Sequence, residues 1–151
     1  MVKKTFLVLI CFISLIIFVS NLYGQGSKKT ITLPNGEVVC DLNGEWDAQY
    51  EQQRMGKYTD ILKITQRGGS FEGVKTIGSP HVPKNAVSIK GELNKNGIAK
   101  VQVVQRILYS GDPGKMTEKQ QLLDCKGQIS EDGSKIIIDG GETIRVTLTR
   151  K

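Results

Sequence analysis

The chain has 151 residues, a formal net charge of +6, three cysteines and one tryptophan. This length is enough for one domain with one hydrophobic core. The positive charge is mild, and no basic run interleaves with aromatic side chains, which argues against nucleic-acid binding.

The first residues have the pattern of an export signal. Two lysines precede an apolar run over residues 6–19, and the small residues Gly24 and Gly26 follow it. The run is shorter than the roughly 20 residues that a membrane-spanning helix needs. We therefore predict a signal peptide over residues 1–26, with an uncleaved N-terminal anchor as the alternative. The protein is then exported, to the periplasm or beyond the cell, and touches a membrane only if the leader stays attached.

Residues 27–41 are expected to form an N-terminal arm. Thr30–Leu33 and Glu37–Cys40 flank Pro34-Asn35-Gly36, in which the Asn-Gly pair supplies the positive φ angles of a tight turn. The arm therefore contains a short β-hairpin.

Two cysteines, Cys40 and Cys125, lie outside the leader. An exported chain meets an oxidising environment that permits a disulfide between them, and closing so long a loop would stabilise the fold by about 4 kcal/mol. Two buried thiols in different strands fit equally well, because free cysteine packs as a small hydrophobic side chain.

Residues 42–151 predict an all-β domain. No window outside the leader has the 3.6-residue apolar period of a helix, and short connections rich in glycine and asparagine separate apolar-alternating runs. Such short connections join antiparallel neighbours, which indicates a meander. The eight runs are Leu42–Glu51, Asp60–Arg67, Ser70–Ile77, Ala86–Leu93, Ile98–Tyr109, Gln120–Ile129, Lys135–Asp139 and Thr143–Thr149.

The meander is predicted to close on itself. An open sheet of eight strands leaves two exposed edges, and closure into a barrel removes both. Gly73, Gly91 and Gly127 interrupt apolar runs, where a missing side chain permits the bends or bulges of a small barrel. We expect an eight-stranded antiparallel up-and-down barrel, with a plain sandwich as the alternative.

The only tryptophan lies on the inward face of the first barrel strand. Alternation puts Gly44, Trp46, Ala48 and Tyr50 on one side of this strand. Trp46 then closes one end of the barrel, Gly44 leaves room for the ring, and the indole N–H needs an acceptor such as a backbone carbonyl.

Gly44-x-Trp46, the eight meandering strands and the basic end of Thr147-Leu-Thr-Arg150 resemble the lipocalin-type barrels of the calycin group. In that group an arginine of the last strand packs over the tryptophan of the first. The resemblance covers Leu42–Arg150 and implies that Arg150 closes the barrel over Trp46, with Arg145 as the fallback. It indicates a shortened lipocalin-like domain.

An eight-stranded barrel is either filled by side chains or open enough for one small ligand. Both alternatives remain at this stage, and the same inward residues would line a cavity or fill the core. By alternation these are Tyr50, Leu62, Ile64, Phe71, Ile89, Val101, Val103 and Tyr109, with Gln66 and Gln105 as polar members.

The sequence contains no pattern typical of catalysis or of metal or cofactor binding. His81 is the only histidine and has no second histidine or cysteine cluster to act with. Asp47, Glu51 and Asp60 are expected on the solvated surface. We therefore expect a protein that is not an enzyme and needs no cofactor or metal.

The leading hypothesis is an exported barrel that binds a small apolar or amphipathic molecule at its open end. The alternative is a protein-docking module, for instance an inhibitor of an exported protease. A cavity deep enough for an acyl chain would favour the first, and a packed interior with an exposed apolar rim would favour the second.

Overall fold

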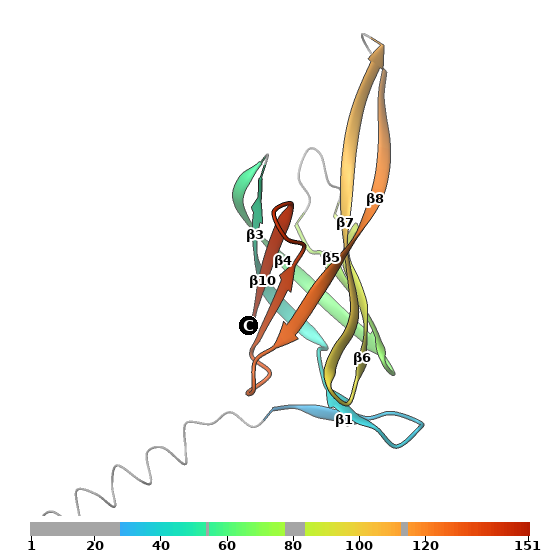
Figure 1. The fold of residues 1–151 in the computed structure, drawn as a ribbon, viewed down its shortest axis with the longest axis vertical. Helices are drawn as coiled ribbons and strands as arrows, with labels where there is room; N and C mark the ends of the chain where they lie inside the picture. The colour runs from blue at the N-terminus through green and yellow to red at the C-terminus, as the bar shows by residue number, and fades with distance from the viewer. Residues whose placement is uncertain (1–27, 54, 78–83, 113–114) are drawn as a thin grey trace, which may run out of the picture.

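The computed structural model describes residues 28–53, 55–77, 84–112 and 115–151. Eight antiparallel strands form a closed barrel, a two-stranded hairpin precedes it, and the described residues contain no helix (Figure 1). The hairpin consists of β1 (Thr30–Thr32) and β2 (Val38–Cys40). The barrel strands are β3 (Gly44–Gln52), β4 (Gly56–Arg67), β5 (Ser70–Lys75), β6 (Val87–Asn94), β7 (Gly97–Asp112), β8 (Lys115–Ile129), β9 (Lys135–Asp139) and β10 (Ile144–Arg150).

All eight predicted barrel strands are confirmed, and so is the meander. Each strand from β3 to β10 pairs with the next, and β10 returns to pair with β3, from Ile144 opposite Gln52 to Arg150 opposite Trp46. The return pairing closes the barrel and excludes the plain sandwich.

One hydrophobic core fills the barrel interior. In β3, Trp46, Ala48 and Tyr50 are at most 1% exposed, whereas the residues between them are exposed. Every other strand residue therefore faces the core, as the period of two requires.

The interior glycines serve packing as well as bending. A Cβ on Gly73, Gly91 or Gly127 would lie 2.6 to 2.7 Å from an isoleucine or phenylalanine side chain of a neighbouring strand. The pairing of β5 with β6 also shifts register directly after Gly73, where we expected a bulge. At Gly127 close packing is the reason for the glycine.

The hairpin β1–β2 lies across the end of the barrel at which Trp46 is buried (Figure 1). Val39 and Cys40 belong to the same core as Trp46, so this hairpin covers the barrel end. Its turn differs from the prediction in one respect. Gly36 has a positive φ of 82°, but Asn35 does not, and the Asn35 side chain instead accepts a hydrogen bond from the Glu37 N–H at 3.1 Å.

Trp46 and Arg150 hold the first and last barrel strands together. The buried indole N–H donates to the Leu42 carbonyl at 3.0 Å, and the Arg150 guanidinium carbon lies 4.5 Å from the centre of the indole ring. The same guanidinium donates to the carbonyl of Asn43 at 3.0 Å and to that of Asp41. Arg150 therefore makes the contact that the resemblance implied, and it also satisfies two carbonyls ahead of β3.

Gly44 has a different role from the one expected. A Cβ at this position would lie 3.7 Å from Arg150 Nη1, which is an ordinary contact, so glycine is not needed to make room for the indole. Its φ of 134° is the reason, since side-chain-bearing residues rarely adopt that conformation.

Cys40 and Cys125 are free thiols in different strands, with Cys40 buried and Cys125 half-buried, so the structure has no disulfide between them. The Cys40 sulfur packs against Gly133 and the Cys125 sulfur against Gly140. These glycines lie at opposite ends of β9, a strand of about 17 Å, whereas the Cα atoms of a disulfide lie within about 7 Å.

Strands β7 and β8 are the longest, and together they project beyond the rest of the barrel (Figure 1). The pairing of β6 with β7 ends at Val103, and that of β8 with β9 begins at Lys126. Beyond these points β7 and β8 pair only with each other among the described strands, as far as Asp112 opposite Lys115. We call this projecting part, residues 104–112 and 115–125, the ribbon.

Replacing Arg150 with Met should lower the free energy of unfolding by about 2–3 kcal/mol, because two charge-assisted hydrogen bonds and the contact with the indole are lost. The matched control is Arg145→Met in the same strand, where the side chain is exposed. Urea unfolding measures both variants. Equal midpoints for the two would show that Arg150 does not hold the barrel ends together.

Candidate functional site

A group of polar side chains lies inside the barrel at the end opposite Trp46. They come from four consecutive strands, β3 to β6, and alternation in β3, β4 and β5 turns them inward. We call the group the polar layer. Its members are Tyr50, Tyr58, Asp60, Lys75 and Ser88.

Lys75 and Asp60 form an ion pair that is almost sealed from solvent. The Lys75 ammonium lies 2.8 Å from Asp60 Oδ2, and the two side chains are 9% and 11% exposed. The other carboxylate oxygen accepts the Ile61 N–H at 2.8 Å. An unpaired charge at this depth would be strongly destabilising, so each group requires the other.

Two stacked tyrosines cover the ammonium. The rings of Tyr50 and Tyr58 lie 4.7 Å apart and 5° from parallel, and the Lys75 nitrogen is 5.1 Å and 5.4 Å from their centres. These distances allow cation–π attraction to both rings. The Tyr50 hydroxyl shares a hydrogen bond of 2.7 Å with Ser88 Oγ, and the Tyr58 hydroxyl accepts one from the Gln52 amide at 3.2 Å.

The environment keeps both tyrosines neutral. Burial raises the pKa of Tyr58 to about 12 and that of Tyr50 still further, and the nearby Asp60 carboxylate adds to the rise. Neutral phenols can donate and accept hydrogen bonds but cannot act as bases near neutral pH. The two phenols can therefore form hydrogen bonds with a polar group but cannot accept a proton near neutral pH.

The residues expected to line a cavity instead pack together in the described part of the barrel. Six of them are at most 2% exposed and belong to one core: Leu62, Ile64, Phe71, Ile89, Val101 and Val103. Tyr50 joins the polar layer, and the side chain of Tyr109 lies outside the described part of the structure. The interior below the polar layer is thus filled.

The two glutamines predicted inside the barrel differ in their roles. Gln66 is 8% exposed, accepts a hydrogen bond from the Leu42 N–H at 2.7 Å and donates one to the Gly68 carbonyl at 3.1 Å. It therefore satisfies backbone groups at the barrel end that Trp46 closes. Gln105 is half-buried, at the base of the ribbon.

Sequence reasoning missed the ion pair. Asp60 was expected on the solvated surface, which is wrong, whereas Asp47 and Glu51 are exposed as expected. The signal was present in the alternation, because Lys75 has the same phase as Phe71, and Asp60 the same phase as Leu62. The prediction placed Asp60 on the surface, against its phase in the strand, because charged residues are rarely buried.

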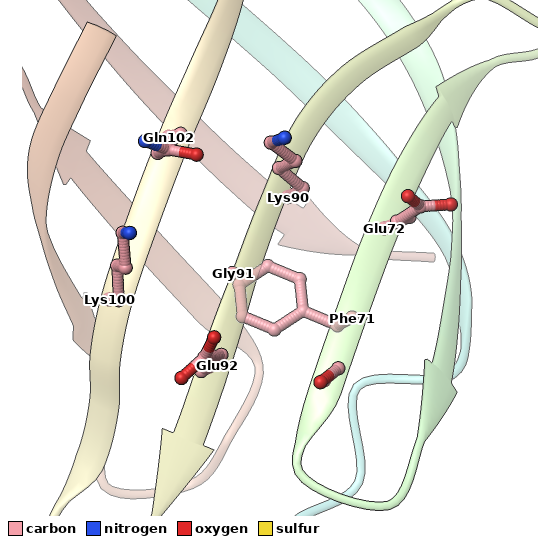
Figure 2. A pocket seen from close by; sticks show the side chains of 8 residues that line it. Phe71, Glu72, Lys90, Gly91, Glu92, Lys100 and Gln102 are labelled. Carbon is pink, nitrogen blue, oxygen red and sulfur yellow. The ribbon is translucent and has the colours of Figure 1, made fainter. Parts of the chain in front are cut away.

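A shallow groove of about 310 Å³ lies on the outer wall of β5, β6 and β7 (Figure 2). In Figure 2 the ring of Phe71 lies beside Gly91, which has no side chain to fill the wall. Glu72 stands opposite Lys90, and Glu92 opposite Lys100, so the groove has alternating charges. Charge balance of this kind is typical of a solvated wall.

The described residues contain no group of three or more His, Cys, Asp or Glu side chains that could hold a metal ion. His81 lies outside them. Within the same residues there is no helix of the length and apolarity needed to cross a bilayer.

The fold is thus that of a small, closed, eight-stranded antiparallel barrel. Comparison with protein-family models, curated proteins and solved structures finds no match for the chain.

Breaking the buried pair should be far more destabilising than breaking an exposed one. Lys75→Met leaves Asp60 buried without a partner and should lower the free energy of unfolding by about 3–5 kcal/mol. Adding Asp60→Asn should recover much of this loss, because the unpaired charge is removed.

The control is Lys57→Met, which breaks a 2.9 Å pair with Glu51 in which both side chains are more than half exposed. This variant should change stability by less than about 1 kcal/mol. Chemical denaturation of the four proteins measures the differences, and equal losses for Lys75→Met and Lys57→Met would contradict the burial of the pair.

The tyrosine stack predicts a loss of stability in alkali. A phenol whose pKa is raised on folding, from about 10, contributes stability that is present below pH 10 and disappears as the pH rises towards 12. In an ultraviolet titration of tyrosinate, the difference between the wild type and Tyr58→Phe should have its midpoint near 12. In denaturant, where Tyr58 is exposed to solvent, the midpoint of the same difference should lie near pH 10. This titration of the unfolded protein is the control. A native midpoint near 10 would mean that Tyr58 is not enclosed.

Proposed function

We propose that the protein is an exported, non-enzymatic docking module, a shortened lipocalin-like barrel that binds a partner protein through its ribbon and the adjoining barrel end. The ribbon is the observation that carries the proposal. Beyond their last barrel partners its two strands pair with no other described strand, so each has a backbone edge without a described partner over residues 104–112 or 115–125. Unpaired strand edges of this length can serve as templates for pairing with another chain.

A partner can use such an edge by adding a strand to it. An extended segment then gains main-chain hydrogen bonds, and its alternate side chains meet the surface beside the edge. An inhibitor that holds an extended loop of an exported protease is one module of this kind.

The barrel end beside the ribbon adds apolar surface. Three large hydrophobic side chains are exposed there: Met55 between β3 and β4 at 69%, Ile77 after β5 at 60% and Leu122 on the ribbon at 45%. A packed interior together with an exposed apolar rim is the combination expected of a docking module. It replaces the ligand cup as the leading hypothesis.

The polar layer supports a second candidate function, the binding of a small amphipathic molecule at the same barrel end. Tyr58 is a partly exposed member of the layer, and its neutral hydroxyl could form a hydrogen bond with a polar head group. Because the interior below is filled, the apolar part of such a molecule would lie against the rim and not inside the barrel.

Native mass spectrometry of the protein purified from its own host tests both candidates. In one variant, Asn-Gly replaces residues 107–119, so that Arg106 and Gln120, which are paired in the ribbon, flank a tight turn. The other variant carries Lys75→Met and Asp60→Asn. Unfolding midpoints near that of the wild type confirm that each barrel is intact.

We expect a co-purifying protein that is lost when the ribbon is shortened and retained by the double variant. A co-purifying small mass that the shortened variant keeps and the double variant loses would instead support the ligand and overturn docking by the ribbon.

A further inference from the structure

A cleft of about 420 Å³ lies between the hairpin β1–β2 and part of the barrel end that the hairpin covers. Its size falls within the range of small-molecule sites. The hairpin, the β6–β7 turn and the end of β8 form its walls. The lining residues are Lys28, Thr30, Val38, Val39, Cys40, Asn94, Lys95, Asn96, Gly97, Ile98, Gly127, Gln128 and Ile129.

The cleft exists because the hairpin contacts the barrel end on two sides and leaves the turn between them uncovered. On one side Leu33 lies 3.6 Å from the Cβ position of Gly69, in the β4–β5 turn. On the other, Lys28 lies 3.1 Å from the Cβ position of Gly133, in the β8–β9 turn. The β6–β7 turn, residues 94–97, lies at the open space between these contacts.

The lining has charges of one sign only. Lys28 and Lys95 carry ammonium groups, and no Asp or Glu is among the lining residues. Asn94, Asn96 and Gln128 add amide groups that can donate hydrogen bonds. Positive charge in a partly enclosed space raises the local concentration of anions.

Part of the remaining lining is apolar. Val38 is 53% exposed, and Ile98 and Ile129 are partly buried against the core. The lysines could therefore attract the charged group of an anion, and the apolar side chains could contact its hydrocarbon chain. If only water occupied the cleft, the apolar side chain of Val38 would stay in contact with solvent, which is unfavourable in free energy compared with its burial against a hydrocarbon chain.

We propose that this cleft is a binding site for a small amphipathic anion, with its charged group between Lys28 and Lys95 and its chain against Val38 and Ile98. The site lies at the barrel end opposite the ribbon, so it is independent of the docking function proposed above. It also differs from the polar layer, which lies inside the barrel.

Cys40 provides a reporter at the site. Cys40 is among the residues that line the cleft and is 7% exposed, and burial raises the pKa of its thiol, so alkylation should be slow. Cys125 is a matched reference outside the cleft, because it is also a free thiol whose pKa is raised by burial. Peptide mass spectrometry follows the alkylation of each cysteine separately in the full chain.

The probe is decanoate, and decanol is the neutral analogue. At a decanoate concentration ten times its dissociation constant, the alkylation rate of Cys40 should fall about tenfold, while that of Cys125 stays the same. Decanol should protect Cys40 much less, because it lacks the charge that the lysines attract.

Two double variants test the lysines. Lys28→Gln with Lys95→Gln should abolish the protection, measured as the ratio of rates with and without decanoate within each variant. Lys63→Gln with Lys100→Gln removes the same charge from exposed positions outside the cleft and should leave the protection intact. Equal protection of both cysteines, equal protection by decanol, or protection that survives the loss of Lys28 and Lys95 would each overturn the proposal.

Discussion

The pairing of β10 with β3, held at its end by Arg150 over the indole of Trp46, is the contact on which the rest of the structure depends. It joins residues 92 to 104 positions apart and turns a meander with two free edges into a ring. Without it Val146 and Leu148 of β10 would lie on an edge strand of an open sheet instead of in a closed core. Because the ring is closed and filled, the features available for binding lie at its two ends.

The two ends are built from different chemistry. At one, Trp46, Leu42 and the hairpin form an apolar closure, and Gln66 satisfies the backbone there. At the other, a sealed ion pair and two stacked tyrosines take the place of apolar side chains. A buried ion pair contributes little to stability compared with well-packed hydrophobic residues, so stability alone does not explain its presence. The ribbon starts at this same end (Figure 1), and Ser88 of the polar layer directly precedes Ile89, which pairs with Val103 at the base of the ribbon.

The sequence predicted the barrel well because the features that define it are local. Alternation and turn residues located all eight strands, and the inward phase of Trp46 followed from its neighbours. Features that depend on distant neighbours were predicted less well. Cys40 and Cys125 pack against Gly133 and Gly140, so the length of β9 between these glycines keeps the two thiols apart. The spacing of the cysteines in the sequence does not show this distance. Lys75 and Asp60 have the inward phase, but only the folded register shows that they meet. The strands of the ribbon extend past the predicted ends at Tyr109 and Gln120 because they pair with each other through a polar stretch without alternation.

The closure itself can be measured directly in solution. Nuclear Overhauser effects between backbone protons report strand pairing residue by residue, and closure places Tyr50 opposite Val146 and Ala48 opposite Leu148. Cross-strand effects linking these pairs, together with those along the meander from β3 to β10, are the result that a closed barrel requires. A complete meander without any effect between β3 and β10 would mean an open sheet and would contradict the account.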